Sequence, residues 1–231
     1  MDNRLSFIVQ SQDGRRPLTI DVRALWNGGW AGRDQATVRH HAEELASIGI
    51  QPPATVPIYF PLANNLATTS DRIQVLGPET SGEVEYALLF AEPDGVYITV
   101  ASDHTDRAYE RYGIQHSKQL CPNALATEVW PYAEVHPHWD QLVLRCWTLR
   151  EGRRALYQEA ALSALLSADS WLNTLAVSGI VRPGLVFLSG TPPLIGALTY
   201  ADAYDIELED PVLGRAIRHH YAVDVLGPGH Q

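Results

Sequence analysis

Short segments rich in β-branched and aromatic residues recur along the chain, and they restrict its fold more than any other feature. Seven of them are bounded on at least one side by Gly, Pro, Asp or Ser: LSFIVQ, EVEYALLF, VYITVAS, QLVLRCWTLR, GLVFLSG, YDIELED and HYAVDVL. Runs of this length and composition, bounded by turn-forming residues, are typical of β-strands. The pattern predicts a mainly β (α+β) fold of sandwich or rolled-barrel type with a few peripheral helices.

Two segments favour helix instead. Residues 34–47 begin at Asp34, a good N-cap residue, and stop before Gly49, a common C-terminal signal. Residues 156–166 are rich in alanine and leucine, which have high helix propensity. We therefore expect helices over these two ranges.

Length and charge limit the class of partner. The 231 residues, 45% of them hydrophobic, suit a single domain over residues 1–231. A net charge of −10 disfavours nucleic acid or an anionic membrane and favours a small-molecule partner. The amino terminus lacks the pattern of a signal peptide and no run is long enough to span a membrane, so we expect a soluble, cytoplasmic protein. Two cysteines, Cys121 and Cys146, are too few for a disulfide framework and are expected to be buried free thiols.

The segment GEVEYALLF carries two closely spaced carboxylates. Side chains alternate along a strand, so Glu83 and Glu85 point the same way. A turn at EPDG and the next strand can form a hairpin that brings Asp103 beside them. Such a group is either a solvated strand end or an oxygen-rich site for magnesium, manganese or calcium.

The segment SDHTDR allows other interpretations. Asp103, His104, Asp106 and His116 could form a zinc or mixed-metal cluster. Strand alternation argues against this, since His104 points away if Asp103 points into a site. Asp106 and Arg107 could pair on the surface.

Residues 34–47 also contain two histidine–glutamate pairs. His41 and Glu44 fall beside the apolar stripe of the expected helix, whereas His40 and Glu43 fall on the opposite side. A glutamate that holds one imidazole nitrogen raises the basicity of the ring, which suits a general base for water. An ordinary surface pair has the same spacing.

The segment LVFLSGTPP places small residues after an apolar strand. Gly190 leaves room for a ligand near the backbone, and Thr191 offers a hydroxyl and an amide to a carboxylate. A plain strand-to-turn junction has the same composition.

In their order along the chain, these segments resemble the fumarylacetoacetase (fumarylacetoacetate hydrolase) superfamily. RHHAEEL resembles its lid helix with a His-x-x-Glu pair, and GEVEYALLF its Glu-x-Glu strand. SDHTDR is similar to its Asp-x-Ser/Thr-x-Arg segment and HSKQLCP to the segment of its active-site lysine. PGLVFLSGTP and DAYDIELED are similar to its closing Gly-Thr-Pro segment and following strand. The resemblance covers about residues 20–225.

This resemblance implies a mixed β-roll of the C-terminal type of that superfamily, a lid helix at about 34–47 and a homodimer. It also implies a divalent cation, Mg²⁺ or else Mn²⁺ or Ca²⁺, and an oxo acid substrate. The implied roles are metal ligation by Glu83, Glu85 and Asp103; activation of water by His41 and Glu44; stabilisation or protonation of an enolate by Lys118; and contact with substrate by Arg107, Gly190 and Thr191.

The expected function is hydrolysis of a carbon–carbon bond in a small acylpyruvate-like or related 2-oxo acid. One alternative is a decarboxylase, hydratase or dehydratase, or tautomerase that uses the same metal and the same enolate chemistry. The other is a non-catalytic module that binds a small acid.

Overall fold

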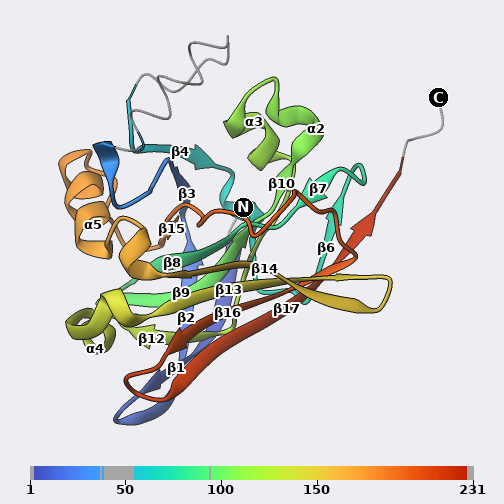
Figure 1. Ribbon diagram of the computed structural model, residues 1–231. Helices are drawn as coiled ribbons and strands as arrows, with labels where there is room; N and C mark the ends of the chain where they lie inside the picture. The colour runs from blue at the N-terminus through green and yellow to red at the C-terminus, as the bar shows by residue number, and fades with distance from the viewer. Residues whose placement is uncertain (1–2, 37, 39–54, 94, 228–231) are drawn as a thin grey trace.

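A computed structural model describes residues 3–36, 38, 55–93 and 95–227. Figure 1 shows two large sheets packed face to face, with short helices at separate places on their periphery. The larger has ten strands in the order β2-β1-β12-β9-β8-β15-β3-β4, with β11 and β5 joined beside β9. Its strands are β1 (Asn3–Ser11), β2 (Gly14–Val22), β3 (Ala24–Gly29), β4 (Ile58–Leu62), β5 (Ala67–Thr68), β8 (Val84–Ala91), β9 (Gly95–Asp103), β11 (Asn123–Leu125), β12 (Glu128–Pro131) and β15 (Leu185–Leu188).

The second sheet has five strands in the order β14-β13-β16-β17-β6. They are β6 (Arg72–Val75), β13 (Val143–Arg150), β14 (Arg153–Ala161), β16 (Ala203–Asp210) and β17 (Arg215–Val225), and a small separate pair is β7 (Thr80–Ser81) with β10 (Thr105–Asp106). Both large sheets are mixed, since β1 pairs with β12, β15 with β3 and β17 with β6 in parallel. The predicted mainly β fold is confirmed, and all seven predicted strands are present.

The ten-stranded sheet curls around its own core. Side chains of β1 and β2 pack against side chains of β8, β9 and β15 in one apolar cluster, so the same sheet supplies both walls. Ala87 and Leu89 of β8 face this inner core, whereas Tyr86 and Leu88 face the second sheet. Burial on both sides explains why β8 is apolar except for Glu85.

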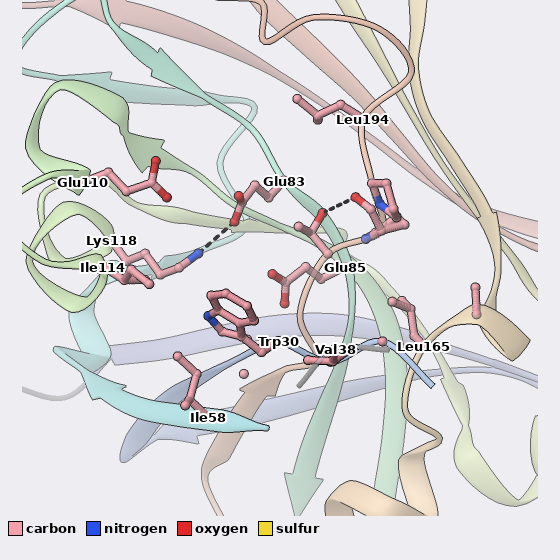
Figure 2. Close-up of a pocket in the computed structure, with 18 of the residues that line it drawn as sticks. Trp30, Val38, Ile58, Glu83, Glu85, Glu110, Ile114, Lys118, Leu165 and Leu194 are labelled. Carbon is pink, nitrogen blue, oxygen red and sulfur yellow. Dashed lines mark hydrogen bonds and ion pairs between the residues drawn. The ribbon is translucent and has the colours of Figure 1, made fainter. Parts of the chain in front are cut away.

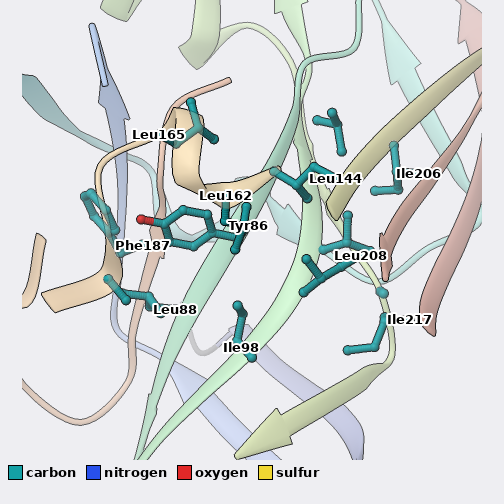
Figure 3. Close-up of a cluster of buried hydrophobic side chains, with 14 of the residues drawn as sticks. Tyr86, Leu88, Ile98, Leu144, Leu162, Leu165, Phe187, Ile206, Leu208 and Ile217 are labelled. Carbon is teal, nitrogen blue, oxygen red and sulfur yellow. The ribbon is translucent and has the colours of Figure 1, made fainter. Parts of the chain in front are cut away.

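A second core fills the space between the two sheets. Figure 3 shows Leu88 and Ile98 of the larger sheet on the same cluster as Leu144, Leu208 and Ile217 of the smaller one. This packing fixes one face of the β8–β9 hairpin and leaves the other face to the roll interior.

The helices that the structure describes from end to end are short. They are α2 (Arg107–Glu110), α3 (Ile114–Gln119), α4 (Tyr132–Val135) and α5 (Ala168–Val177), with 3₁₀ turns η1 (Asn64–Leu66), η2 (His136–Gln141) and η3 (Leu162–Ala164). The Ser167 side chain caps α5 by accepting from the Ser170 N–H. In the part of the chain that the structure describes, no helix is long and apolar enough to cross a membrane. Both cysteines are free and buried, as predicted.

The helix predicted over residues 156–166 is wrong. Residues up to Ala161 belong to β14, which pairs along its whole length with β13, and a 3₁₀ turn follows. Tertiary pairing therefore overrides the helix propensity of alanine and leucine there. The helix predicted over residues 34–47 begins as expected, because the Asp34 carboxylate accepts from the Ala36 N–H at 3.0 Å. Most of that range lies outside the described residues.

Candidate metal centre and active site

The β8–β9 hairpin brings three carboxylates together. Val84 pairs with Ser102 and Glu85 with Ala101, and the Asp103 N–H donates to the Glu83 carbonyl at 2.9 Å. The odd-numbered residues of both strands face the roll interior, so all three acids point to the same side. One carboxylate oxygen from each of Glu83, Glu85 and Asp103 lies within 4.8 Å of the others. The hairpin predicted from the sequence is confirmed.

Two carboxylate oxygens of this cluster are buried without a hydrogen-bond partner in the described part of the chain. Glu85 and Asp103 are fully buried. The Glu85 Oε2 accepts from the Gly190 N–H at 2.6 Å, whereas Glu85 Oε1 and Asp103 Oδ1 have no hydrogen-bond partner among the described residues. A buried carboxylate oxygen without a partner is costly. An all-oxygen donor set suits a hard cation such as Mg²⁺, Mn²⁺ or Ca²⁺, so the three carboxylates are suitable ligands for such a cation.

Lys118 extends from α3 into the acidic cluster. Its Nζ donates to Glu83 Oε2 at 2.8 Å and also to Asp103 Oδ2. Figure 2 shows Lys118 pointing at Glu83, with Glu85 beside the pair. The lysine therefore contacts the acidic cluster and its charge is shared between two of the three acids, whereas its catalytic role stays a prediction.

Burial and charge divide the three carboxyl groups. Burial would raise the pKa of Glu83, but Lys118 and Arg107 outweigh it and lower that pKa to about 2. Burial and the neighbouring Asp103 raise the pKa of Glu85 well above its usual range. Burial also raises the pKa of Asp103, although Lys118 opposes it. Glu85 is thus the acid of the three that most lacks a positive partner.

The Arg107 guanidinium is hydrogen-bonded to three side chains of the protein. Its guanidinium donates to Ser81 Oγ at 2.7 Å, to Glu83 Oε1 at 2.7 Å and to Glu110 at 3.1 Å. Asp106 instead caps α2 by accepting from the Tyr109 N–H. The interpretation of Asp106 and Arg107 as a surface pair is therefore wrong, and the arginine orients Glu83.

His104 points away from the carboxylates, as strand alternation predicted. It is fully buried between the sheets, where its ring nitrogens hydrogen-bond Tyr221 at 3.1 Å and Thr80 at 2.9 Å. Burial, with help from Arg107, lowers the pKa of His104 to about 3, so the ring is neutral. Among the residues that the structure describes, the glutamate–aspartate trio is the one group with metal-ligand spacing, which removes the zinc alternative.

The segment after β15 forms hydrogen bonds with Glu85 and with the backbone of β8. The Gly190 N–H donates to the Glu85 carboxylate. The Thr191 hydroxyl donates to the Val84 carbonyl at 3.0 Å and accepts from Gln158 Nε2 at 2.7 Å. Contact of Gly190 and Thr191 with substrate stays a prediction, and any contact through Thr191 falls to its backbone N–H or to a spare lone pair of its hydroxyl.

A cavity of about 760 Å³ opens over these groups. Trp30, Ile58 and Leu165 lie on one side of it, opposite Leu194, with the carboxylates between them (Figure 2). This volume is in the range of small-molecule sites. His41 and Glu44, the pair predicted to activate water, lie outside the described residues.

Two buried asparagines were not predicted. Asn123 pairs with Asp103 across β11 and β9, and its Nδ2 donates to Asn27 Oδ1 at 3.0 Å. Both side chains are fully buried next to the acidic cluster. The only signal in the sequence is a lone asparagine inside each of two apolar segments, LWNGGW and NALA, which is too weak to use without the fold.

Sequence and structure comparisons give consistent results. The family described as "Protein of unknown function (DUF2848)" matches residues 28–221. No curated protein matches the sequence. Among solved structures, a putative fumarylacetoacetate isomerase/hydrolase from Oleispira antarctica is 18% identical, with a TM-score of 0.66 over 94% of this chain and 99% of that one.

Two further structures share the fold. A 2-keto-3-deoxy-D-arabinonate dehydratase complexed with magnesium and 2,5-dioxopentanoate is 15% identical, with a TM-score of 0.64 over 94% of this chain and 78% of that one. A yeast fumarylacetoacetate hydrolase family protein is 16% identical, with a TM-score of 0.58 over 90% and 95% of the two chains. The fold inferred from the sequence resemblance is confirmed.

Proposed function

Since the chain belongs to the DUF2848 family of proteins of unknown function and has the fumarylacetoacetate hydrolase fold, we propose that it is a divalent-metal-dependent enzyme acting on a small 2-oxo acid. The proposed reaction is hydrolysis of a carbon–carbon bond in an acylpyruvate-like substrate. The observation that carries the proposal is the carboxylate trio Glu83, Glu85 and Asp103 beside the cavity, in which one oxygen of Glu85 and one of Asp103 are buried without a hydrogen-bond partner among the described residues.

In this proposal the three acids are the metal ligands. Glu85 and Asp103 would hold the cation through the oxygens that have no partner among the residues described by the structure, with Glu83 as third ligand. When bound, the divalent ion supplies Lewis-acid polarisation of the substrate oxygens. Arg107 and Gly190 position the ligands, since each binds one of the glutamates.

Lys118 and the 34–47 segment carry the remaining roles. Burial would lower the pKa of Lys118, but Asp103 and the two glutamates raise it above its ordinary value, so the ammonium keeps its proton. Its charge would stabilise the negative charge that develops on the substrate when the bond breaks. We propose His41, oriented by Glu44, as the base that removes a proton from the attacking water.

A second candidate uses the same site without attack by water. Decarboxylation, dehydration or tautomerisation needs the cation and Lys118 but no water-activating base. A dehydratase complexed with magnesium shares the fold. This similarity favours the second candidate over unrelated chemistries.

Product analysis distinguishes these candidates. The protein is incubated with acylpyruvates and other 2-oxo acids, with Mg²⁺ or Mn²⁺ or with a chelator, and products are identified by mass. Hydrolysis adds water and gives two fragments, decarboxylation releases carbon dioxide, and dehydration removes water. Binding of the acids without any metal-dependent product would favour a non-catalytic module.

A further inference from the structure

Charge is unevenly distributed in the cavity. Among the residues that the structure describes, the ionisable ones that line the cavity are Glu83, Glu85, Arg107, Glu110 and Lys118. Both cations already have carboxylate partners: Lys118 binds Glu83 and Asp103, and Arg107 binds Glu83 and Glu110. Within this lining, no positive group is left to pair with a second substrate carboxylate.

The count of charges leads to the same result. With Asp103 behind the lining, four carboxylates face two cations, a formal excess of two negative charges. One divalent ion neutralises this excess. The oxo acid group of a substrate then brings its own negative charge, so a second carboxylate would find no unpaired positive group among the described residues that line the cavity.

The walls away from the acids are apolar. Ile58 and Phe60 come from β4, Ile114 from α3, and Leu165, Leu194 and Leu198 from the segments around β14 and after β15. In Figure 2, Ile114 lies next to Glu110 and Lys118, so apolar surface begins directly beside the charged groups. Apolar walls favour burial of substrate methylene groups and leave a buried charge unpaired.

We propose, on the basis of the function proposed above, that the site selects monocarboxylate 2-oxo acids with an uncharged, apolar tail and rejects those with a second carboxylate. Glu110 is the specificity-determining residue. It keeps Arg107 occupied and places a negative charge, 39% exposed, on the cavity wall where a distal carboxylate would approach.

Two acids of equal chain length test this preference. Binding of 2-oxohexanoate and of 2-oxoadipate is measured by calorimetry in the presence of Mn²⁺, so the result does not depend on turnover. The wild-type protein is expected to bind 2-oxohexanoate at least about tenfold more tightly. In Glu110→Gln the amide can still accept from Arg107 but carries no charge, so the preference should shrink by about tenfold through tighter binding of 2-oxoadipate.

The control is Glu151→Gln, which removes the same charge from a side chain that is 82% exposed on a turn. It should leave both affinities unchanged. A further variant, Leu194→Asn, should weaken 2-oxohexanoate and not 2-oxoadipate, because it makes the apolar wall polar.

The outcomes separate this inference from the proposed function. Equal or tighter binding of 2-oxoadipate by the wild type, or an unchanged preference in Glu110→Gln, would overturn the selectivity while leaving the metal-dependent oxo acid site in place. Failure of both acids to bind with Mn²⁺ present would overturn the proposed function and the selectivity together.

Discussion

Lys118 is the residue whose environment has the most direct consequence. It is 5% exposed and its ammonium lies between Glu83 and Asp103. Its charge therefore serves the folded state as well as any chemistry, because it offsets two carboxylates that burial would otherwise destabilise. The sequence resemblance indicated the catalytic role alone; the structural role follows only from the contacts.

Replacement of Lys118 by methionine should expose this double role. With a chelator present, loss of the buried partner should reduce the free energy of unfolding by about 3 to 5 kcal/mol. Added Mn²⁺ should recover much of this loss, since a cation binds the same carboxylates and stabilises the state that it binds. Thermal unfolding with and without Mn²⁺ measures both effects, and an unfolding temperature equal to that of the wild type in chelator would contradict the assignment.

His104 predicts how stability depends on acid. Its pKa is lowered to about 3 in the folded protein, whereas an unfolded histidine titrates near 6.5. The unfolded chain therefore binds more protons between these pH values, so stability falls as the pH drops below about 6.5. Denaturant midpoints in chelator at pH 7 and pH 5 measure the fall.

The matched variant is His104→Asn, which keeps an amide near Thr80 and Tyr221 but does not titrate. It should lose less stability than the wild type between pH 7 and pH 5. An equal loss in both proteins would assign the acid sensitivity to other groups.

At the scale of elements, the β8–β9 hairpin was predictable and the support around it was not. The alternation of Glu83, Val84 and Glu85 and the turn at EPDG are local signals, and local signals were enough to place the carboxylates on one face. The contact of the Gly190 N–H with Glu85 joins residues 105 positions apart, which no spacing rule reveals. The error over residues 156–166 has the same origin, because β14 is set by its pairing with β13.

The segment after β15 gives the element-scale prediction. Gly190 has a φ of +93°, and a Cβ there would lie 2.7 Å from the Ala31 Cβ. Gly190→Ala should therefore destabilise the protein by roughly 1 to 3 kcal/mol and weaken Mn²⁺ binding, because the shifted backbone no longer holds Glu85.

Gly152→Ala is the control for Gly190→Ala. Its φ is +74°, but a Cβ there meets nothing within 4 Å. It should cost stability through backbone strain alone and leave Mn²⁺ affinity unchanged. Equal Mn²⁺ affinity in the two variants would show that Gly190 has no part in positioning Glu85.

At the scale of the molecule, the rolled sheet explains why a buried acidic cluster is tolerated. The interior of the roll is apolar along β8 and β9 and becomes polar at the end where Glu85, Asp103 and Asn27 lie. The same fold appears at 15–18% identity in the structures compared, so it depends on burial pattern more than on particular residues. Ordered short segments in the sequence were therefore enough to infer the fold, whereas substrate selectivity depends on side chains such as Glu110 that only the cavity brings together.

Direct titration with Mn²⁺, followed by electron paramagnetic resonance, tests the central claim that Glu83, Glu85 and Asp103 hold a divalent ion. The wild-type protein should bind one ion, and Glu85→Gln and Asp103→Asn should each weaken binding by about tenfold or more, because a neutral amide replaces an anionic ligand. Both variants should fold, since the amide oxygen can still accept from Gly190 or Lys118. Glu151→Gln, remote from the site, should bind like the wild type. Unchanged affinity in both ligand variants would contradict the claim.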